Sequence, residues 1–166
     1  MEPVTIIIPG IVPVKKNTGK VSMYYKDKQG RTVPRKHPVY YYSTAYKDWA
    51  RSAIIACQKF KTQSKLTFPL TCKMNMQCIF YYPVDRVVDL SALYEAPQDV
   101  LCGKAGIDRV PPEIYQIIQD DNTRFIGSHD GSRLALDPVN PRTVIVLTDF
   151  SYSINKGVVN ATMQSM

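Results

Sequence analysis

Two adjoining stretches decide the fold of this chain: Leu70-Thr-Cys-Lys-Met-Asn-Met-Gln-Cys-Ile-Phe80 and Val84-Asp-Arg-Val-Val-Asp-Leu-Ser-Ala-Leu93. In the first, the even positions are apolar or cysteine, and the odd positions from 71 to 77 are polar. This alternation predicts a strand with one face on the core. In the second, apolar residues at three-and-four spacing continue to residue 101 and predict an amphipathic helix that begins at Asp89. Pro97 interrupts this pattern, so we expect either a kink or two helical pieces.

Outward from these stretches, the patterns predict one α+β domain over residues 1–150, a small mixed β-sheet packed with two principal helices. Ser43 is a good N-cap for the other principal helix. Asp130 and Gly131 favour a hairpin turn between strands at 123–128 and 133–136. Further predicted features are strands at 4–8 and 143–148, a hairpin tip at 27–30, and a flexible polar tail at 151–166.

Composition limits the class of protein. The chain has 166 residues, 45% of them hydrophobic, and no apolar run approaches the ~18 residues that a membrane span needs. Its start lacks the pattern of a secretory signal, so we expect a cytoplasmic protein with no membrane partner. The four cysteines form no C-x-x-C pair, which favours buried structural thiols over zinc ligands or disulfides.

The distribution of charge points to a polyanionic partner. Residues 1–65 contain 13 Lys and Arg against 3 Asp and Glu, whereas the remainder contains 8 against 11. The first part therefore has a net charge of +10 and the rest −3. Such asymmetry suits a protein that holds nucleic acid with one part and a cation with the other, although a solvated basic surface is the common alternative.

Three carboxylates are candidates for the cation site. Asp89 stands where a strand ends and a helix starts, and Asp120 and Asp121 follow about thirty residues later. A few carboxylates suit Mg²⁺, which serves phosphodiester cleavage by neutralising charge and activating water. The three fit one site if the strand beginning near Asn122 lies beside the start of the helix. The alternative for Asp89 is a simple helix cap.

His129 invites a different interpretation, in which it forms a hydrolase triad with Ser128 or Ser132. The sequence has no nucleophile-elbow pattern, and a His-Asp-Gly turn explains the residue. We therefore do not favour a serine hydrolase.

The order and spacing of several motifs resemble the RusA family of Holliday junction resolvases, and the resemblance spans nearly the whole chain before the tail. The family's helix start, helix end and acidic pair match three segments here. They are Asp89-Leu-Ser-Ala-Leu93, Asp99-Val-Leu101 and Asp120-Asp121. The stretches Ser43-Thr-Ala-Tyr-Lys-Asp-Trp49 and Ser128-His-Asp-Gly-Ser-Arg133 are also similar to phage members of the family. The family's middle carboxylate falls on Ser91 and its lysine falls on Glu95.

This resemblance implies a Mg²⁺-dependent endonuclease, with Mn²⁺ as a substitute and no organic cofactor, that acts as a homodimer on branched DNA such as four-way junctions. Its expected setting is recombination, repair or phage DNA processing in the cytoplasm of a bacterial or phage-infected cell. The implied catalytic and metal-binding residues are Asp89, Asp121 and Asp120, helped by Glu95 or Ser91. Lys15, Lys16, Arg35, Lys36 and Lys47 would hold phosphates. The alternatives are a non-catalytic DNA-binding relative with a degraded metal site, and a module that binds an acidic protein.

Overall fold

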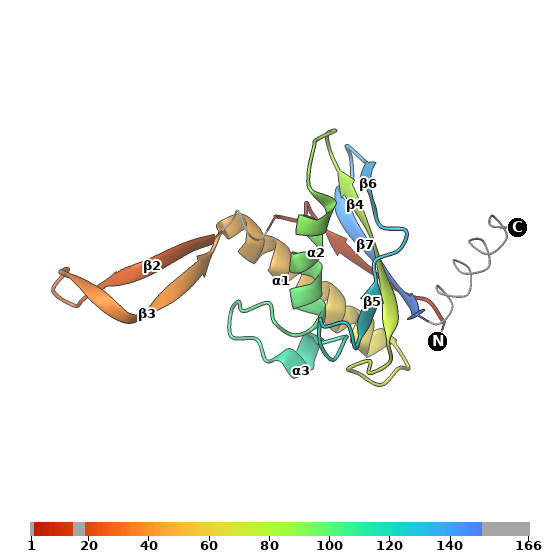
Figure 1. Ribbon diagram of the computed structural model, residues 1–166, viewed down its shortest axis with the longest axis horizontal. Helices are drawn as coiled ribbons and strands as arrows, with labels where there is room; N and C mark the ends of the chain where they lie inside the picture. The colour runs from red at the N-terminus through yellow and green to blue at the C-terminus, as the bar shows by residue number, and fades with distance from the viewer. Residues whose placement is uncertain (1, 15–18, 151–166) are drawn as a thin grey trace, which may run out of the picture.

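The computed structural model describes residues 2–14 and 19–150, and it confirms the predicted α+β class. Two principal helices pack on one side of a mixed sheet, and a separate hairpin extends from this body (Figure 1). The predicted phosphate-binding Lys15 and Lys16 and the tail at 151–166 lie outside the described residues. The elements are β1 (Val4–Pro9), β2 (Gly19–Lys26), β3 (Thr32–Tyr42), α1 (Thr44–Gln63), β4 (Met74–Tyr82), α2 (Leu90–Leu101), α3 (Pro112–Tyr115), β5 (Ile126–Ser128), β6 (Arg133–Leu136) and β7 (Arg142–Asp149).

The main sheet has the order β1, β7, β4, with β5 and β6 on the far edge. Strand β7 is antiparallel to both β1 and β4, so it occupies the centre of the sheet. Met74, Met76, Cys78 and Phe80 are fully buried, as the alternation of residues 70–80 predicts. The buried face of this sheet and the apolar faces of the two helices form one core.

Strands β5 and β6 correct one prediction. The sequence favours a hairpin between them, but both pair with β4 in parallel, β5 near its start and β6 near its end. They therefore follow one another along the same edge. The turn between them is held by Asn75, whose side-chain oxygen accepts hydrogen bonds from Ser128 Oγ and from the backbone N–H of Asp130, both at 2.7 Å. These contacts with β4 replace the bonds of a hairpin ladder.

Helix α1 begins as predicted. The hydroxyl of Ser43 accepts a hydrogen bond from the backbone N–H of Tyr46 at 3.1 Å, which satisfies one of the free donors at the helix start. One face of the helix is buried and carries Tyr46, Trp49, Ala50, Ala53, Ile54 and Cys57. Among the residues that the structure describes, no helix is both long and apolar enough to cross a membrane.

Helix α2 runs through Pro97 as one element and is not split into two pieces. Pro97 removes one backbone hydrogen bond, but the ring is buried together with Ala96, Val100 and Leu101. Burial of these apolar side chains offsets the lost bond. The unbroken helix means that Asp89 and Cys102, its two cap residues, stand about 20 Å apart by helix geometry.

Candidate functional site

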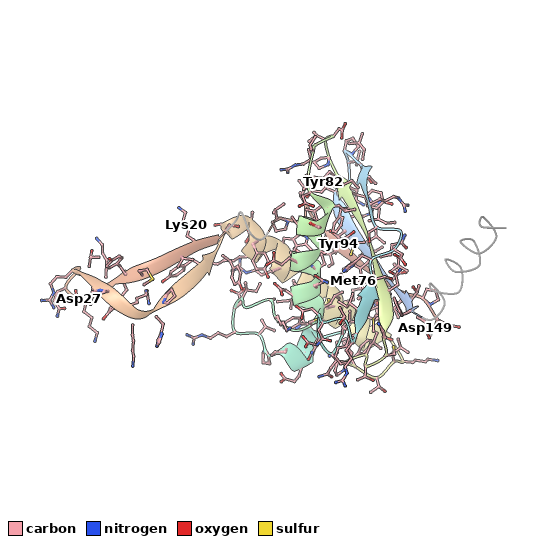
Figure 2. All side chains as sticks on the ribbon, in the orientation of Figure 1. Lys20, Asp27, Met76, Tyr82, Tyr94 and Asp149 are labelled. Carbon is pink, nitrogen blue, oxygen red and sulfur yellow. The ribbon has the colours of Figure 1, made fainter. Side chains whose placement is uncertain are left out.

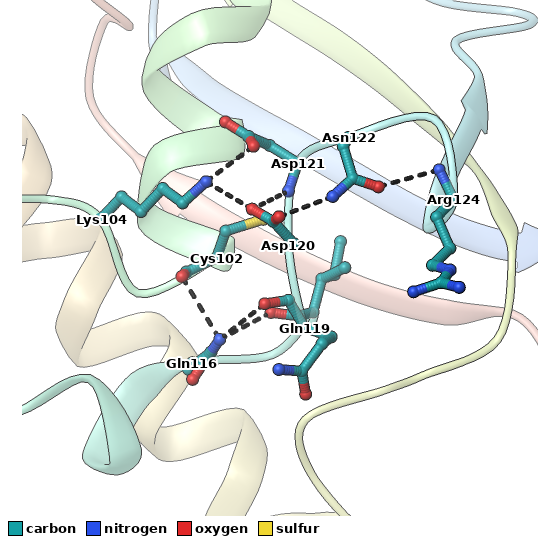
Figure 3. A network of polar contacts seen from close by, with 9 residues as sticks. Cys102, Lys104, Gln116, Gln119, Asp120, Asp121, Asn122 and Arg124 are labelled. Atoms are coloured by element: carbon teal, nitrogen blue, oxygen red, sulfur yellow. Dashed lines mark hydrogen bonds and ion pairs between the residues drawn. The ribbon is translucent and has the colours of Figure 1, made fainter.

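The most distinctive polar cluster of the described residues joins three charged side chains at the end of α2 (Figure 3). The ammonium group of Lys104 donates to Oδ1 of Asp120 and, at 2.7 Å, to Oδ1 of Asp121. Asp120 also accepts hydrogen bonds from its neighbours, from the backbone N–H of Asp121 at 2.9 Å and from Nδ2 of Asn122 at 2.6 Å. The two carboxylates therefore hold one cationic group between them.

Electrostatics keep this cluster charged. The hydrogen bond from Lys104, together with that from the backbone of Asp121, lowers the pKa of Asp120 to about 2. The same contacts raise the pKa of Lys104 above its ordinary value. The nearby Cys102 thiol is buried, and its pKa is raised to about 12, mainly by desolvation. The cluster is thus ionic at neutral pH, while its thiol neighbour is an unreactive neutral group.

The chain that carries the acidic pair is tied to the C-terminal end of α2. The backbone N–H groups of Ile117 and Ile118 donate to the carbonyl of Leu101 at 2.8 and 3.0 Å. The amide of Gln116 donates to the carbonyl of Cys102 at 3.3 Å and to those of Ile118 and Gln119 at 3.1 Å. These bonds satisfy carbonyls that the helix end leaves free, and they place the pair beside the residues that follow α2.

Gly103 turns the chain so that Lys104 meets the pair. Its φ of +75° is in the left-handed region that glycine adopts most readily, and a Cβ there would lie 2.8 Å from Cβ of Pro112. The backbone N–H of Lys104 then donates to the carbonyl of Asp99 at 2.6 Å. A glycine at this position is needed for both the turn and the packing.

Asp89 and Ser91 form a separate unit at the opposite end of the helix. Asp89 is the N-cap of α2, and its Oδ1 accepts hydrogen bonds from the backbone N–H and the hydroxyl of Ser91, at 2.9 and 2.8 Å. This is the geometry of the cap that the sequence left open as an alternative. A role for either residue in binding metal stays a prediction.

The predicted grouping of Asp89 with the acidic pair required the strand near Asn122 to lie beside the start of α2. Strand β5 instead begins at Ile126, next to Met74 at the start of β4, whereas Asp89 follows the end of β4. Over the described parts of the chain, no three or more His, Cys, Asp or Glu side chains are grouped in a way that would hold a metal ion. The pair and the cap are thus built by different ends of the same helix.

Glu95 and Asp99 lie between these ends. Both are close enough to Tyr46 on α1 to add to the rise in the pKa of that phenol, which is caused mainly by burial. Asp99 is itself buried, with 8% of its surface exposed. The two acids therefore lie within electrostatic range of Tyr46, and a role for Glu95 as a substitute metal ligand stays a prediction.

The chemistry of the acidic pair nevertheless suits a hard cation. Mg²⁺ prefers a few carboxylate oxygens and retains several waters. Asp120 and Asp121 offer such oxygens on the surface, with 35% and 36% of their side chains exposed, and already bind the ammonium group of Lys104. The pair thus fits a divalent ion that replaces Lys104.

The predicted phosphate-binding residues occupy different places. Lys36 is exposed on the β2–β3 hairpin, and Arg35 beside it is half-buried. Lys47 is half-buried in the first turn of α1, where its charge helps to lower the pKa of Asp108, which forms an ion pair with Arg51. Lys36 is thus the more exposed of the two lysines, and contact of these residues with phosphate stays a prediction.

His129 is held by packing and not by a triad. Its ring stacks on Tyr94, with centroids 4.1 Å apart, and its Nδ1 lies 2.9 Å from the carbonyl of Met76. Because a carbonyl only accepts, Nδ1 carries the proton in this contact. Burial lowers the pKa of His129, and Ser132 Oγ accepts a hydrogen bond from the backbone of Cys78. His129 is thus a half-buried residue held by stacking and by the contact with the backbone of β4.

Lys104 is the site residue that the sequence did not reveal. It carries no motif of its own, and its partners lie 16 and 17 residues away along the chain. The sequence offers one indirect signal. Gly103 follows the apolar pattern that ends at residue 101 and marks the end of the helix, so that Lys104 lies outside the helical pattern.

Replacing Lys104 by glutamine is expected to raise the pKa of Asp120 from about 2 towards the ordinary value of about 4. A carboxylate whose pKa is lowered by folding stabilises the folded state at pH values above its unfolded-state pKa. This contribution is lost as the pH falls through the folded-state pKa. The K104Q variant should therefore lose less stability than wild type between pH ~4 and ~2. The measurement is an NMR titration of the carboxyl carbons, combined with urea unfolding at each pH.

The matched control is Arg51→Gln, because Arg51 forms its ion pairs with Asp48 and Asp108 and not with the cluster. This variant should leave the titration of Asp120 unchanged. An Asp120 midpoint that is the same in K104Q as in wild type would contradict the assigned contact.

Comparison with known proteins adds no further information on the site, because neither the protein-family models nor the curated proteins contain a match to this sequence.

Proposed function

We propose that this chain is a Mg²⁺-dependent endonuclease that cleaves branched DNA, such as a four-way junction, in recombination, repair or phage DNA processing. It acts as a homodimer in the cytoplasm of a bacterial or phage-infected cell, as the resemblance to the RusA family implies.

The observation that carries this proposal is the spatial separation of opposite charges in one domain. The β2–β3 hairpin projects from the body (Figure 1) and has an excess of lysine and arginine, while the acidic pair lies beside the residues that follow α2 (Figure 3). Lysine and arginine neutralise the phosphate backbone and supply most of the affinity for nucleic acid. A cluster of ionised aspartates cannot serve that purpose, but it suits the cation that phosphodiester hydrolysis requires.

In this proposal Asp120 and Asp121 hold the ion. When bound, Mg²⁺ supplies an activated water and neutralises charge on the phosphate. While no divalent ion is present, the single positive charge of Lys104 offsets half of the negative charge of the pair and reduces the repulsion between the two adjacent carboxylates. An ion bound by the pair would release the ammonium group of Lys104, which would then be available to a phosphate oxygen.

A second candidate function is DNA binding without cleavage. Two observations favour it: Lys104 already binds both carboxylates of the acidic pair, and Asp89 is engaged as the cap of α2. A protein of this kind would retain the basic hairpin and lose the need for metal.

Cleavage of an end-labelled four-way junction distinguishes the two candidates. We expect the full chain to nick the junction in Mg²⁺ or Mn²⁺, to be inactive in EDTA, and to leave a linear duplex of the same sequence intact. The duplex is the matched control for substrate structure, and EDTA is the control for metal. Both arms use the same protein preparation, so that a contaminating nuclease would be detected on the duplex.

The enzyme proposal fails if the chain binds the junction but does not nick it in either metal. Calorimetric titration with Mn²⁺ then tests the second candidate directly. If the chain binds DNA without cleaving it, wild type and Asp121→Asn should show the same heat of Mn²⁺ binding.

A further inference from the structure

The β2–β3 hairpin is an arm that stands apart from the core. Its two strands, Gly19–Lys26 and Thr32–Tyr42, pair only with each other and form a separate two-stranded sheet. The second strand runs directly into the cap of α1, so that the arm projects from one end of that helix (Figure 1). An isolated two-stranded hairpin is marginally stable in water, and most side chains of this one are exposed. Such a surface is suited to contact with a partner.

The charge of the arm indicates a polyanionic partner. Residues 19–42 include six Lys and Arg and a single acid, Asp27. Asp27 is engaged locally at the tip, where it binds Nε of Arg31 at 2.8 Å and accepts backbone bonds from Gln29 and Arg31 (Figure 2). The exposed lysines of the arm are therefore not neutralised by the arm itself; they are Lys20, Lys26, Lys28 and Lys36.

Tyr24 is the most exposed of the arm's tyrosines whose side chains the structure describes. The residue is 58% exposed, against 43% for Tyr25 and Tyr41. The carbonyl of Tyr24 accepts hydrogen bonds from Ser22 Oγ at 2.6 Å and from Nε of Arg35 at 3.1 Å. A register shift between Ser22 and Tyr24 marks an irregularity in the ladder, a feature that commonly re-aims a side chain. The backbone is thus ordered before any partner binds, which lowers the entropic cost of a contact to the ring.

Arg35 holds the backbone that carries this ring, through its bond to the carbonyl of Tyr24. Besides the bond to Tyr24, its Nη2 donates to the hydroxyl of Tyr41 at 2.9 Å, and its guanidinium lies 5.2 Å from the centre of the Tyr25 ring. These contacts engage Arg35 within the arm. Its role is therefore to hold Tyr24 in place, and the contacts to phosphate fall to the lysines.

We propose that the arm binds unpaired nucleotides, with the ring of Tyr24 stacked on a base and Lys26, Lys28 and Lys36 in contact with the flanking phosphates. A positively charged ribbon with an exposed aromatic ring is the arrangement that holds single strands, because every base offers a face for stacking. The proposal rests on the proposed function and deepens it, since it names the part of a branched substrate that the arm recognises. Bases in an intact duplex are stacked on each other and do not offer this face.

The test measures binding by the full chain in EDTA, so that cleavage plays no part. Fluorescence anisotropy compares a labelled oligothymidine of about 20 nucleotides with a labelled duplex of the same length. We expect the single strand to bind more tightly, and Tyr24→Ala to weaken that binding by about 10-fold, within the range measured for loss of one stacked base. Tyr24→Phe should bind like wild type, because it retains the stacking face.

Val21→Ala is the matched control, because Val21 is 62% exposed on the same strand and takes no part in stacking. A Lys28→Gln variant should bind single strand with a smaller salt dependence, by about 0.7 in the slope of log affinity against log salt. Circular dichroism of each variant checks that the arm change leaves the body folded.

The proposal is overturned if the duplex binds as tightly as the single strand, or if Tyr24→Ala binds oligothymidine like wild type. It is also overturned if Tyr24→Ala dissociates a dimer in sedimentation while its affinity for oligothymidine is unchanged, because the arm would then join two copies of the chain. Junction cleavage is scored separately. If the chain cleaves the junction but the arm variants bind oligothymidine like wild type, only this proposal fails. If oligothymidine binding is as expected but the chain does not cleave the junction, only the enzymatic function fails.

Discussion

Asp121→Asn is expected to lower the rate of junction cleavage by about 100- to 1,000-fold, because metal-dependent stabilisation of transition-state charge is worth several kcal/mol. Asp121 is the better of the two aspartates to change. Asp120 also accepts bonds from the backbone of Asp121 and from Asn122, so that its loss would disturb the turn. The carboxylate of Asp121 accepts a hydrogen bond from Lys104, and asparagine has nearly the same volume. The measurement is single-turnover cleavage in saturating Mg²⁺.

The control is Asp130→Asn, which removes the same charge from an exposed turn whose structural bonds are made by the backbone. Its cleavage rate should match that of wild type. Junction affinity in EDTA should be equal in all three proteins. If the Asp121→Asn variant cleaves at the wild-type rate, the acidic pair is not part of the catalytic site.

Asp89→Asn, measured in the same assay, decides the role of the helix cap. Asparagine caps a helix about as well as aspartate, so the fold should be retained. A loss of rate comparable to that of Asp121→Asn would assign Asp89 to the metal site. An unchanged rate would leave it as a cap only.

Phe80→Ala is expected to reduce the free energy of unfolding by about 4 kcal/mol, within the range for buried aromatic truncations. Phe80 has no exposed surface, and its ring centroid lies 6.0 Å from that of Tyr94 on α2. Tyr94 in turn stacks on His129, at the turn between β5 and β6. The cavity would therefore loosen the contact between the sheet and helix α2, which Asp89 caps and to whose end the acidic pair is tied. Urea unfolding followed by circular dichroism gives the value.

Leu136→Ala is the corresponding control, since Leu136 is 60% exposed on strand β6. Its effect should stay within about 0.5 kcal/mol, as is usual for surface positions. A loss below about 1 kcal/mol for Phe80→Ala would contradict the burial of this ring.

The elements of this fold follow from local patterns. The alternation in residues 70–80 predicts β4 because side-chain direction in a strand has a period of two, and β4 is observed from Met74 to Tyr82. Ser43 predicts the start of α1 because a hydroxyl there satisfies a free backbone donor. Residues 27–30 predict the tip of a hairpin, and β2 and β3 pair as expected. Each of these signals acts over a few residues.

The pairing of elements does not follow in the same way. The turn at Asp130 and Gly131 was expected to join a hairpin, but Asn75 on β4 binds the turn and both flanking strands align with β4. Nothing within residues 123–136 encodes that competition, because the deciding hydrogen bonds come from a residue more than fifty positions away. The separation of the hairpin from the core is also a property of the assembled molecule.

The same distinction between local signals and tertiary contacts applies to the candidate site. The sequence by itself determined that Asp89 starts a helix, that Asp120 and Asp121 follow as an ionisable pair, and that the basic charge is concentrated before residue 66, because these are properties of residue type and local spacing. Only the tertiary structure decided which charges meet. Hydrogen bonds from Ile117 and Ile118 to Leu101 bring the acidic pair to the end of α2, where Lys104 binds it, while Asp89 caps the other end. Coulomb attraction and hydrogen bonding act over a few ångströms, and the backbone bonds between the 117–118 segment and the end of α2 set those distances.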